Sequence, residues 1–484
     1  MRSLGFTPII GLEIHAQLLT QTKLFCSCKS DSDAPPNSLT CPVCLGLPGA
    51  LPVLNQKAVE MGVKFALAVN SKINKRSVFE RKNYFYPDLP KGYQITQHHY
   101  PLSQGGFIKI KNINKKIKIP IEQIHLEEDS GKSIHTNGLE QRTYLDFNRS
   151  GIPLLEIVTQ PKINTPKQAT QFLKKAIVTL QYLDICNGNM DQGSLRCDVN
   201  ISIQKKDSKK KGPKIEIKNL NSFSFLQKAL EYEIKRQLTK RKKGIPIEQE
   251  TRFWDEKNSQ TVLMRTKEET KDYRYFPEPD LAPLVITNEE ITRIKKTIPE
   301  SPDHKIDRFI KQYKIPSNEA ASLASSKELS DYFEQTVKYC KAPSETSHWI
   351  LREVLNYLNL TSTFISDFPV KPKQMAELIE HICGSRISRQ TAKEIVFPEM
   401  IHTEKKVTDI VKEKKLSLIS DEKQLKKIIK KIMGNNKNQV NQYLEGKSQV
   451  IKYLMGQVMK QTKGKADPKL TNNLLIEILD RYNK

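Results

Sequence analysis

Apolar and polar residues alternate along the first part of the chain in a way that predicts both strands and helices. Up to about residue 290, short runs rich in β-branched and aromatic residues are separated by Gly, Pro and polar turns. These runs predict strands at residues 107–119, 142–147, 197–203 and 215–217. Apolar residues recur at spacings of three and four over residues 56–69, 167–183 and 225–240, which predicts helices. We therefore predict an α+β region with a mostly antiparallel sheet.

Beyond a Pro-rich hinge at 277–283 the pattern becomes nearly all helical. Residues 345–358 place four apolar residues along one side of a helix, namely Trp349, Val354, Leu355 and Leu358. From about residue 409 the chain is basic, with 17 Lys and Arg against 8 Asp and Glu, a net charge of +9. These changes predict three parts: an α+β domain at 1–293, a helical domain at 294–408 and a small helical tail at 409–484.

The formal charge of the whole chain is +25, which favours a polyanionic partner, and nucleic acid is the most plausible one. Abundant Lys, Ile and Asn also indicate an AT-rich genome, so part of this excess is background. The lysine run at 205–211 predicts a solvated hairpin loop. No apolar run approaches the length of a membrane span, so no membrane partner is expected.

Four of the eight cysteines form two close pairs. One residue separates Cys26 from Cys28, two separate Cys41 from Cys44, and twelve lie between the pairs. Such pairs predict a tetrahedral thiolate site for zinc, and a shell of four sulfurs leaves no open position, which indicates a structural role. The alternatives are two disulfides or four unrelated thiols. The lack of a secretory segment argues against disulfides.

Acidic side chains occur in two unusual contexts. In the sequence GLEIH, strand-like alternation places Glu13 and His15 on one face, with Leu12 and Ile14 on the other. Further along, IHLEEDSGK crowds three successive acids into a turn, Glu127, Glu128 and Asp129. Adjacent acids repel one another unless a cation is near, and magnesium would supply that charge. The alternative is an exposed acidic turn on a basic protein.

Other predicted strands also carry charged residues on one face. The members of this group are Arg149, Glu156, Arg196, Asp198, Glu216 and Lys218. Acids suit a divalent ion and Arg or Lys suit phosphates, with the aromatic residues Tyr84 and Tyr86 in the same region. A sheet with one face in solvent would look similar. The SGKS string at 130–133 is no phosphate loop, because Leu126 stands where that motif needs glycine.

Long strings in the chain resemble the B subunit of the bacterial and organellar glutamyl/aspartyl-tRNA amidotransferase family, essentially from end to end. The strings are GLEIH at 11–15, CPVCLGLPG at 41–49, RKNYFYPDLPKGYQ at 81–94, HLEED at 125–129, the segment 146–158, RCDVN at 196–200 and YRYFPEPDL at 273–281. All four cysteines are present, whereas some members of that family lack them.

The resemblance implies a cradle-shaped α+β domain similar to glutamine synthetase and guanidino kinases, followed by a helical domain and a tRNA-binding tail. It implies a ligase that forms carbon–nitrogen bonds with glutamine as amido donor. ATP and Mg²⁺ would serve to phosphorylate the side-chain carboxylate of Glu-tRNA(Gln) or Asp-tRNA(Asn). Ammonia would come from an amidase A subunit, in a heterotrimer completed by a small C subunit.

By the same resemblance, site roles are expected for three sets of residues. The expected magnesium ligands are Glu13, His15, Glu127, Glu156, Asp198 and Glu216, with Glu128 also in the catalytic set. Arg149, Arg196 and Lys218 are expected to contact phosphates, and Tyr84 and Tyr86 to line the pocket for the tRNA terminus. Zn²⁺ on Cys26, Cys28, Cys41 and Cys44 is expected to be structural.

Two rival hypotheses remain open from the sequence. One is an RNA-binding module with a zinc ribbon and no chemistry. The other is a metal-dependent hydrolase with zinc on Glu13, His15 and His125. No Gly/Ser-rich amidase signature occurs, so the chain is not expected to hydrolyse glutamine itself. The absence of an Arg- and Ser-rich presequence before Gly11 favours a bacterial cytoplasm.

Overall fold

The computed structural model describes residues 5–112, 115–135, 142–205, 212–266, 272–403, 405–418, 421–462 and 464–482. The chain separates into two units, Met1–Ser301 and Pro302–Lys484. The domain boundaries predicted after residues 293 and 408 stay predictions.

Most of the lysine run at 205–211 lies outside the described residues. In the described part of the chain, no helix combines the length and apolar character needed to cross a membrane.

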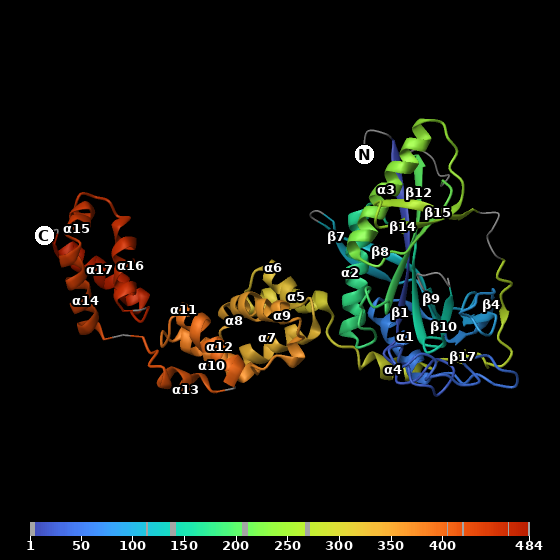
Figure 1. Ribbon diagram of the computed structural model, residues 1–484, viewed down its shortest axis with the longest axis horizontal. Coiled ribbons are helices and arrows are strands. Elements are labelled where there is room, and N and C mark those ends of the chain that lie inside the picture. Colours follow the sequence, from blue (N-terminus) through green and yellow to red (C-terminus); the bar gives the residue numbers. More distant parts are fainter. Residues whose placement is uncertain are drawn as a thin grey trace. The chain divides into compact units, whose positions relative to one another are not determined.

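One large sheet organises the first unit (Figure 1). Its strand order is β15-β14-β13-β12-β1-β11-β8-β6-β2, and β7 pairs with β8. All pairings are antiparallel except that of β13 with β14, so the sheet is mixed. The strands are β1 (Phe6–Gln17), β2 (Lys72–Ile73), β6 (Ser103–Gln104), β7 (Phe107–Asn112), β8 (Lys115–Glu128), β11 (Pro153–Thr159), β12 (Leu195–Lys205), β13 (Ile215–Lys218), β14 (Glu250–Asp255) and β15 (Gln260–Thr266).

Three helices cover the apolar face of this sheet: α1 (Gln56–Ala68), α2 (Pro166–Tyr182) and α3 (Phe223–Lys242). Polar residues determine where they begin, because Asn55, Thr165 and Ser222 each accept a hydrogen bond from a backbone N–H of the first turn. Phe172 on α2 and Leu230 on α3 are fully buried in the same core as the inward side chains of β1. The helices therefore leave the other face of the central strands available for polar side chains.

Short strands and one further helix complete the first unit. They are β3 (Arg76–Ser77) paired with β17 (Leu284–Val285), β4 (Glu80–Asn83) between β5 (Tyr93–Thr96) and β16 (Phe276–Pro277), β9 (Lys132–His135) paired with β10 (Thr143–Asp146), and α4 (Asn288–Lys295).

The second unit is helical and contains two apolar clusters, one over residues 309–416 and one over 425–479. Its helices are α5 (Pro302–Tyr313), α6 (Ser317–Leu323), α7 (Lys327–Cys340), α8 (Pro343–Trp349), η3 (Ile350–Val354), α9 (Leu355–Thr361), η4 (Ile365–Asp367), α10 (Pro372–Cys383), α11 (Arg389–Thr391), η5 (Ala392–Val396), α12 (Phe397–Thr403), α13 (Val407–Glu413), α14 (Glu422–Asn435), α15 (Lys437–Leu444), α16 (Val450–Gln461) and α17 (Pro468–Tyr482).

The α+β class of the first region and the helical character of the second are confirmed. The helix predicted at 345–358 lies within α8, η3 and α9. Trp349, Val354 and Leu358 are buried, and Leu355 is partly buried against the same core. The single strand predicted at 107–119 is wrong. Two strands occur there, because β8 runs antiparallel to β7 and pairs with it from Asn112 and Lys115 onward.

Candidate functional site

The polar face of the central strands floors a cavity of about 680 Å³. On β1, Leu12 and Ile14 are fully buried, whereas Glu13 and His15 point to the opposite side and line the cavity. This is the division that the alternation of GLEIH predicts. The predicted site residues that line the cavity are Glu13, His15, Tyr84, Glu127, Glu156, Arg196, Asp198, Glu216 and Lys218. Glu128, Arg149 and Tyr86 do not line it.

Strand pairing explains why residues far apart in the sequence meet here. His15 lies opposite Glu156 of β11 on one side and opposite Arg196 of β12 on the other. Glu156 in turn lies opposite His125 of β8. Directly opposed residues of an antiparallel pair place their side chains on one face, close enough to interact. The register thus assembles a charged cluster that no single segment of sequence contains.

His15, Glu127 and Glu156 form one group with the geometry of a metal site. The His15 Nε2 atom lies 3.5 Å from Glu127 Oε1 and 3.4 Å from Glu156 Oε2. One ligand atom of each residue falls within 4.8 Å of the others. His125 Nε2 lies 2.9 Å from the same Glu156 oxygen, while its buried Nδ1 atom has no hydrogen-bond partner among the described residues. Two carboxylates and an imidazole are a donor set that fits a divalent cation.

The titration behaviour of this group reflects opposite charges held together. Burial raises the pKa of Glu156, but His125 and His15 outweigh it and hold that pKa well below its ordinary value. Burial lowers the pKa of His15, but attraction to Glu156 outweighs it and raises the pKa to about 9. The carboxylates therefore favour positive charge beside them, and a metal ion that binds His15 would have to displace its proton.

A second acidic group lies beside the first on β1, β12 and β13. Lys218 Nζ lies 2.6 Å from Asp198 Oδ2 and 2.8 Å from Glu216 Oε1. The amide of Asn200 donates to Glu13 Oε1 over 2.5 Å. Burial, followed by repulsion from Glu156, raises the pKa of Glu13. Carboxylates crowded in this way gain from any added positive charge.

Asp129 organises the arginines at the cavity wall, although it was not among the predicted site residues. Arg196 Nη2 donates to Asp129 Oδ1 over 2.7 Å, and Gln17 Nε2 donates to Oδ2 over 3.1 Å. Burial raises the pKa of Asp129, but Arg196 and Arg149 outweigh it and lower that pKa. Asp129 therefore stays ionised and fixes the guanidinium of Arg196 at the cavity. The acidic string HLEED was a signal for it, but its partner was not visible in sequence.

Arg149 and Glu128 lie next to the cavity and have partners of their own. Arg149 Nε donates to the carbonyl of Ser130 over 3.0 Å and lies 3.7 Å from Asp129 Oδ2. Glu128 Oε1 accepts the backbone N–H of Ile95 over 2.9 Å and pairs with Lys91. Since Glu127 and Glu128 are adjacent on a strand, only one of them faces the cavity.

Aromatic side chains gather at and beside the cavity, and Tyr84 and Tyr273 line it. Tyr84 stands edge-on to Tyr86 at 6.0 Å and to Tyr273 at 5.9 Å between ring centroids. Tyr275 stacks on His98 with centroids 4.1 Å apart. Tyr273 and Tyr275 were noted only as part of a motif in the sequence. The wall presents flat rings of the kind on which a nucleobase stacks.

The cavity also contains three cations that the sequence did not single out, Lys82, Lys214 and Arg265. Burial lowers the pKa of Lys82, but attraction to Glu127 outweighs it and raises that pKa. No local pattern marks these residues, because their segments reach the cavity only through the strand order.

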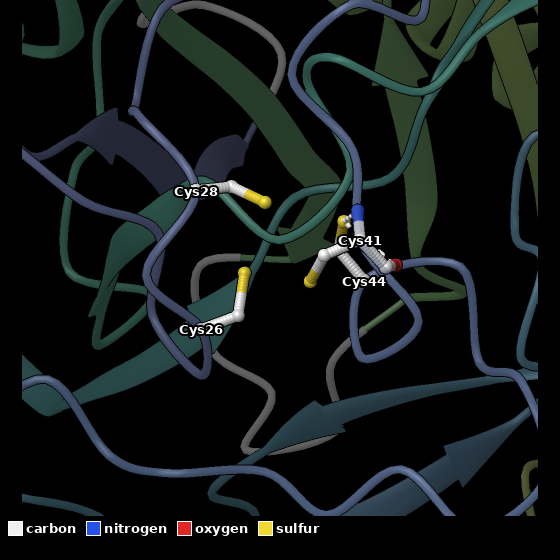
Figure 2. A group of neighbouring side chains, drawn as sticks. All are labelled: Cys26, Cys28, Cys41 and Cys44. Carbon is white, nitrogen blue, oxygen red and sulfur yellow. Dashed lines mark hydrogen bonds between the residues drawn. The ribbon is translucent and has the colours of Figure 1, made fainter.

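The four cysteines form a separate group in the irregular segment between β1 and α1. Figure 2 shows their sulfur atoms pointing toward one another, and all four lie within 4.8 Å. Zinc–sulfur bonds of about 2.3 Å place neighbouring sulfurs about 3.8 Å apart in a tetrahedron, so this donor set fits zinc. None of the eight cysteines is in a disulfide, so the disulfide alternative is wrong.

The thiols of this group differ in proton affinity. A hydrogen bond from Cys26 lowers the pKa of Cys44 to about 4, and burial raises the pKa of Cys28 to about 11. Within the group, Cys44 is therefore the thiol that loses its proton most readily. A zinc ion would deprotonate the remaining thiols as it binds.

Comparison with known proteins gives matches along nearly the whole chain. The GatB/GatE catalytic domain family matches residues 8–292, and the GatB domain family matches residues 331–479. Proteins named as the B subunit of aspartyl/glutamyl-tRNA(Asn/Gln) amidotransferase are similar throughout. That of Thermodesulfovibrio yellowstonii is 51% identical over 98% of this chain and 99% of its own length. Those of Persephonella marina and Thermotoga maritima are 47% and 46% identical, over 98% of this chain and 99% of theirs.

Proposed function

The chain belongs to the GatB family of tRNA amidotransferase B subunits, and we propose that its cavity phosphorylates the side-chain carboxylate of Glu-tRNA(Gln), Asp-tRNA(Asn) or both. Family membership makes it a component of a glutamine-dependent amidotransferase ligase. It decides against the two rival hypotheses, an RNA-binding module without chemistry and a metal-dependent hydrolase. The observation that carries the proposal is the mixture of acids and cations that line one cavity.

The acidic and cationic side chains of the cavity match the requirements of the proposed phosphorylation and amidation. An oxygen of the tRNA-bound carboxylate attacks the γ-phosphorus of ATP, ADP leaves, and an acyl phosphate forms. Ammonia nitrogen then attacks the acyl carbon, phosphate leaves, and one proton is lost to give the amide. A carboxylate has no stable leaving group, whereas an acyl phosphate has one. Because the transferred group carries negative oxygens, catalysis depends on positioning and positive charge.

Each set of residues has a proposed part in this sequence of steps. Arg196 and Lys218 bind phosphate oxygens, and Asp129 holds Arg196 in place. His15, Glu127 and Glu156 would hold Mg²⁺, with Glu13, Asp198 and Glu216 as a second acidic set. Magnesium, when bound, would supply positive charge that offsets the negative charge of the phosphate oxygens. Tyr84 would line the pocket for the tRNA terminus, with Tyr86 packed edge-on against its ring. Arg149 and Glu128 support the wall through their own partners.

The remaining assignments follow the family. The first unit would share its cradle fold with glutamine synthetase and guanidino kinases. The basic tail would hold the outer part of tRNA through phosphate contacts without reading bases. An amidase A subunit and a small C subunit would complete a heterotrimer in the cytoplasm, and ammonia would reach the cavity from the amidase. Zinc on the four cysteines would brace the loop beside the cavity.

Glutamine substitutions at Glu127 and Glu13 test the proposal in the reconstituted complex. Each change removes a charge and keeps the shape, so we expect acyl-phosphate formation to fall about a thousandfold for Glu127→Gln. Glutaminase activity and the melting temperature serve as controls and should not change. Acyl-phosphate formation at the wild-type rate in both variants would show that the site assignment is wrong.

A further inference from the structure

One lysine of the first unit is completely buried beside the cysteine cluster. Lys23 has 0% of its surface exposed, although lysine is among the residues least often buried without a charged partner. Among the described residues, no carboxylate forms an ion pair with it. The charge that compensates this ammonium must therefore come from another kind of group.

The three N–H donors of the ammonium point at three acceptors. Lys23 Nζ lies 2.9 Å from the carbonyl oxygen of Leu39, 3.3 Å from that of Phe147 and 3.6 Å from Cys44 Sγ. An ammonium group has three donors and no acceptor, so all of them are used. Cys44 Sγ is the acceptor that can carry a full negative charge, and it is also one of the four sulfurs of the cluster.

The position of the Lys23 ammonium matters because of the net charge of a zinc ion bound by four thiolates. Four thiolates around one Zn²⁺ ion leave a net charge of −2, and Cys44 is buried, so water does little to screen that charge. We infer that Lys23 is the counter-cation of the metal centre: its ammonium offsets part of the thiolate charge and donates to Cys44, and this sets how tightly the cluster retains zinc. The inference rests on the zinc site proposed above.

The other two bonds of Lys23 connect the centre to its surroundings. Leu39 belongs to the loop between the two cysteine pairs, and its N–H donates to Asn148 Oδ1 over 2.9 Å. Phe147 precedes Asn148 in the turn that also contains Ser150, whose hydroxyl donates to the Cys44 carbonyl over 3.1 Å. Lys23 is thus a positioning residue that joins the cysteine loop to the turn next to the cavity.

Metal retention in the purified complex tests the inference. The variant Lys23→Met keeps the length of the side chain and removes its charge and donors, and Lys23→Gln keeps donors without the charge. We expect both to release zinc at lower chelator concentration, with an affinity about tenfold to a hundredfold weaker, the usual effect of losing a partner behind a metal ligand. Lys29→Met is the matched control, because Lys29 is adjacent to Cys28 but 69% exposed and paired with Asp31.

A spectroscopic measurement separates this role from a purely structural one. With cobalt in place of zinc, loss of the ammonium should raise the energy of the sulfur electrons and move the thiolate-to-cobalt band to longer wavelength. Lys29→Met should leave band and affinity unchanged. Folded Lys23 variants with wild-type affinity and an unshifted band would overturn the inference. A wild-type protein that binds no zinc would instead show that the zinc site itself is wrong.

Chemical labelling provides a test if both variants fail to fold. Acetylation of the wild-type complex, read by mass spectrometry, should leave Lys23 unmodified with zinc bound and modify it once a chelator removes the metal. Lys29 should be modified in both states. Equal protection of Lys23 with and without zinc would contradict its role as counter-cation of the metal.

Discussion

The cavity and the cysteine cluster both gather metal-binding side chains, but they are built in opposite ways. The cavity takes its groups from several paired strands and mixes carboxylates with Arg196 and Lys218. The cluster takes four sulfurs from one irregular segment. They point toward one another, and Cys44 Sγ also accepts hydrogen bonds from Lys23 and from the backbone N–H of Cys41. In the cavity, Arg196 and Lys218 can bind a negatively charged substrate beside the carboxylates. In the cluster, four thiolates fill the coordination shell of one zinc ion. The groups around the metal-binding side chains therefore distinguish the proposed catalytic site from the proposed structural site.

The largest difference between the two regions is expected when the variant Glu156→Gln, in the cavity, is compared with Cys26→Ser, in the cysteine cluster. The first variant removes the carboxylate that contacts both His15 and His125 and should lower acyl-phosphate formation about a thousandfold or more, with zinc content unchanged. The second should lose zinc while ATP still binds. Rapid-quench kinetics and metal analysis on both proteins measure the two effects. The contrast between the two regions fails if Glu156→Gln loses zinc or if Cys26→Ser abolishes ATP binding.

Asp129→Asn should have the next largest effect. Arg196 would keep its charge but lose the anion that fixes it, so we expect kcat for acyl-phosphate formation to fall about tenfold to a hundredfold. The KM for ATP should rise less. Asp191→Asn is the matched control, since Asp191 is exposed and does not line the cavity. An unchanged kcat would show that Asp129 does not position Arg196 for the reaction.

The sequence predicted which residues belong to each region better than it predicted the contacts between them. Alternation placed Glu13 and His15 on one face, and spacing brought the four cysteines together, because each is a local pattern. Strand order is not local, so the contact of Glu156 with His125 and the presence of Arg265 in the cavity were not foreseen. The buried Lys23 gave no signal, since its partners include backbone carbonyls elsewhere in the chain.

Removal of zinc by a chelator should have a moderate effect that depends on the substrate. The segment that borders the cavity would lose its order, so we expect tRNA-dependent amidation to fall on the order of tenfold while ATP affinity stays constant. Amidation assays and nucleotide titration on the chelated, folded complex measure this difference. Full amidation activity without zinc would show that the cluster does not brace the site.

The smallest effect should come from a carboxylate outside both regions. Burial raises the pKa of Glu80, but hydrogen bonds from His99 and the backbone outweigh it and lower that pKa below 4.5. Its contribution to stability is therefore present above about pH 4.5 and is lost as the pH falls through the lower folded-state pKa. Glu80→Gln should reduce the unfolding free energy by about 1–2 kcal/mol at pH 7.

Denaturant titrations from pH 3 to 7 follow this effect. The difference between wild type and Glu80→Gln should shrink toward low pH, and amidation should stay at the wild-type rate. A difference that stays constant with pH would show that the charge of Glu80 contributes nothing.

The most direct test of the central claim follows the γ-phosphate of ATP when no ammonia is present. The complex is mixed with labelled ATP, Mg²⁺ and Glu-tRNA(Gln) without glutamine, then quenched in hydroxylamine. We predict that ATP is cleaved only when the aminoacylated tRNA is present, and that the glutamyl side chain is recovered as a hydroxamate. Wild-type amidation on later addition of glutamine, with no ATP cleavage and no hydroxamate before it, would contradict the claim.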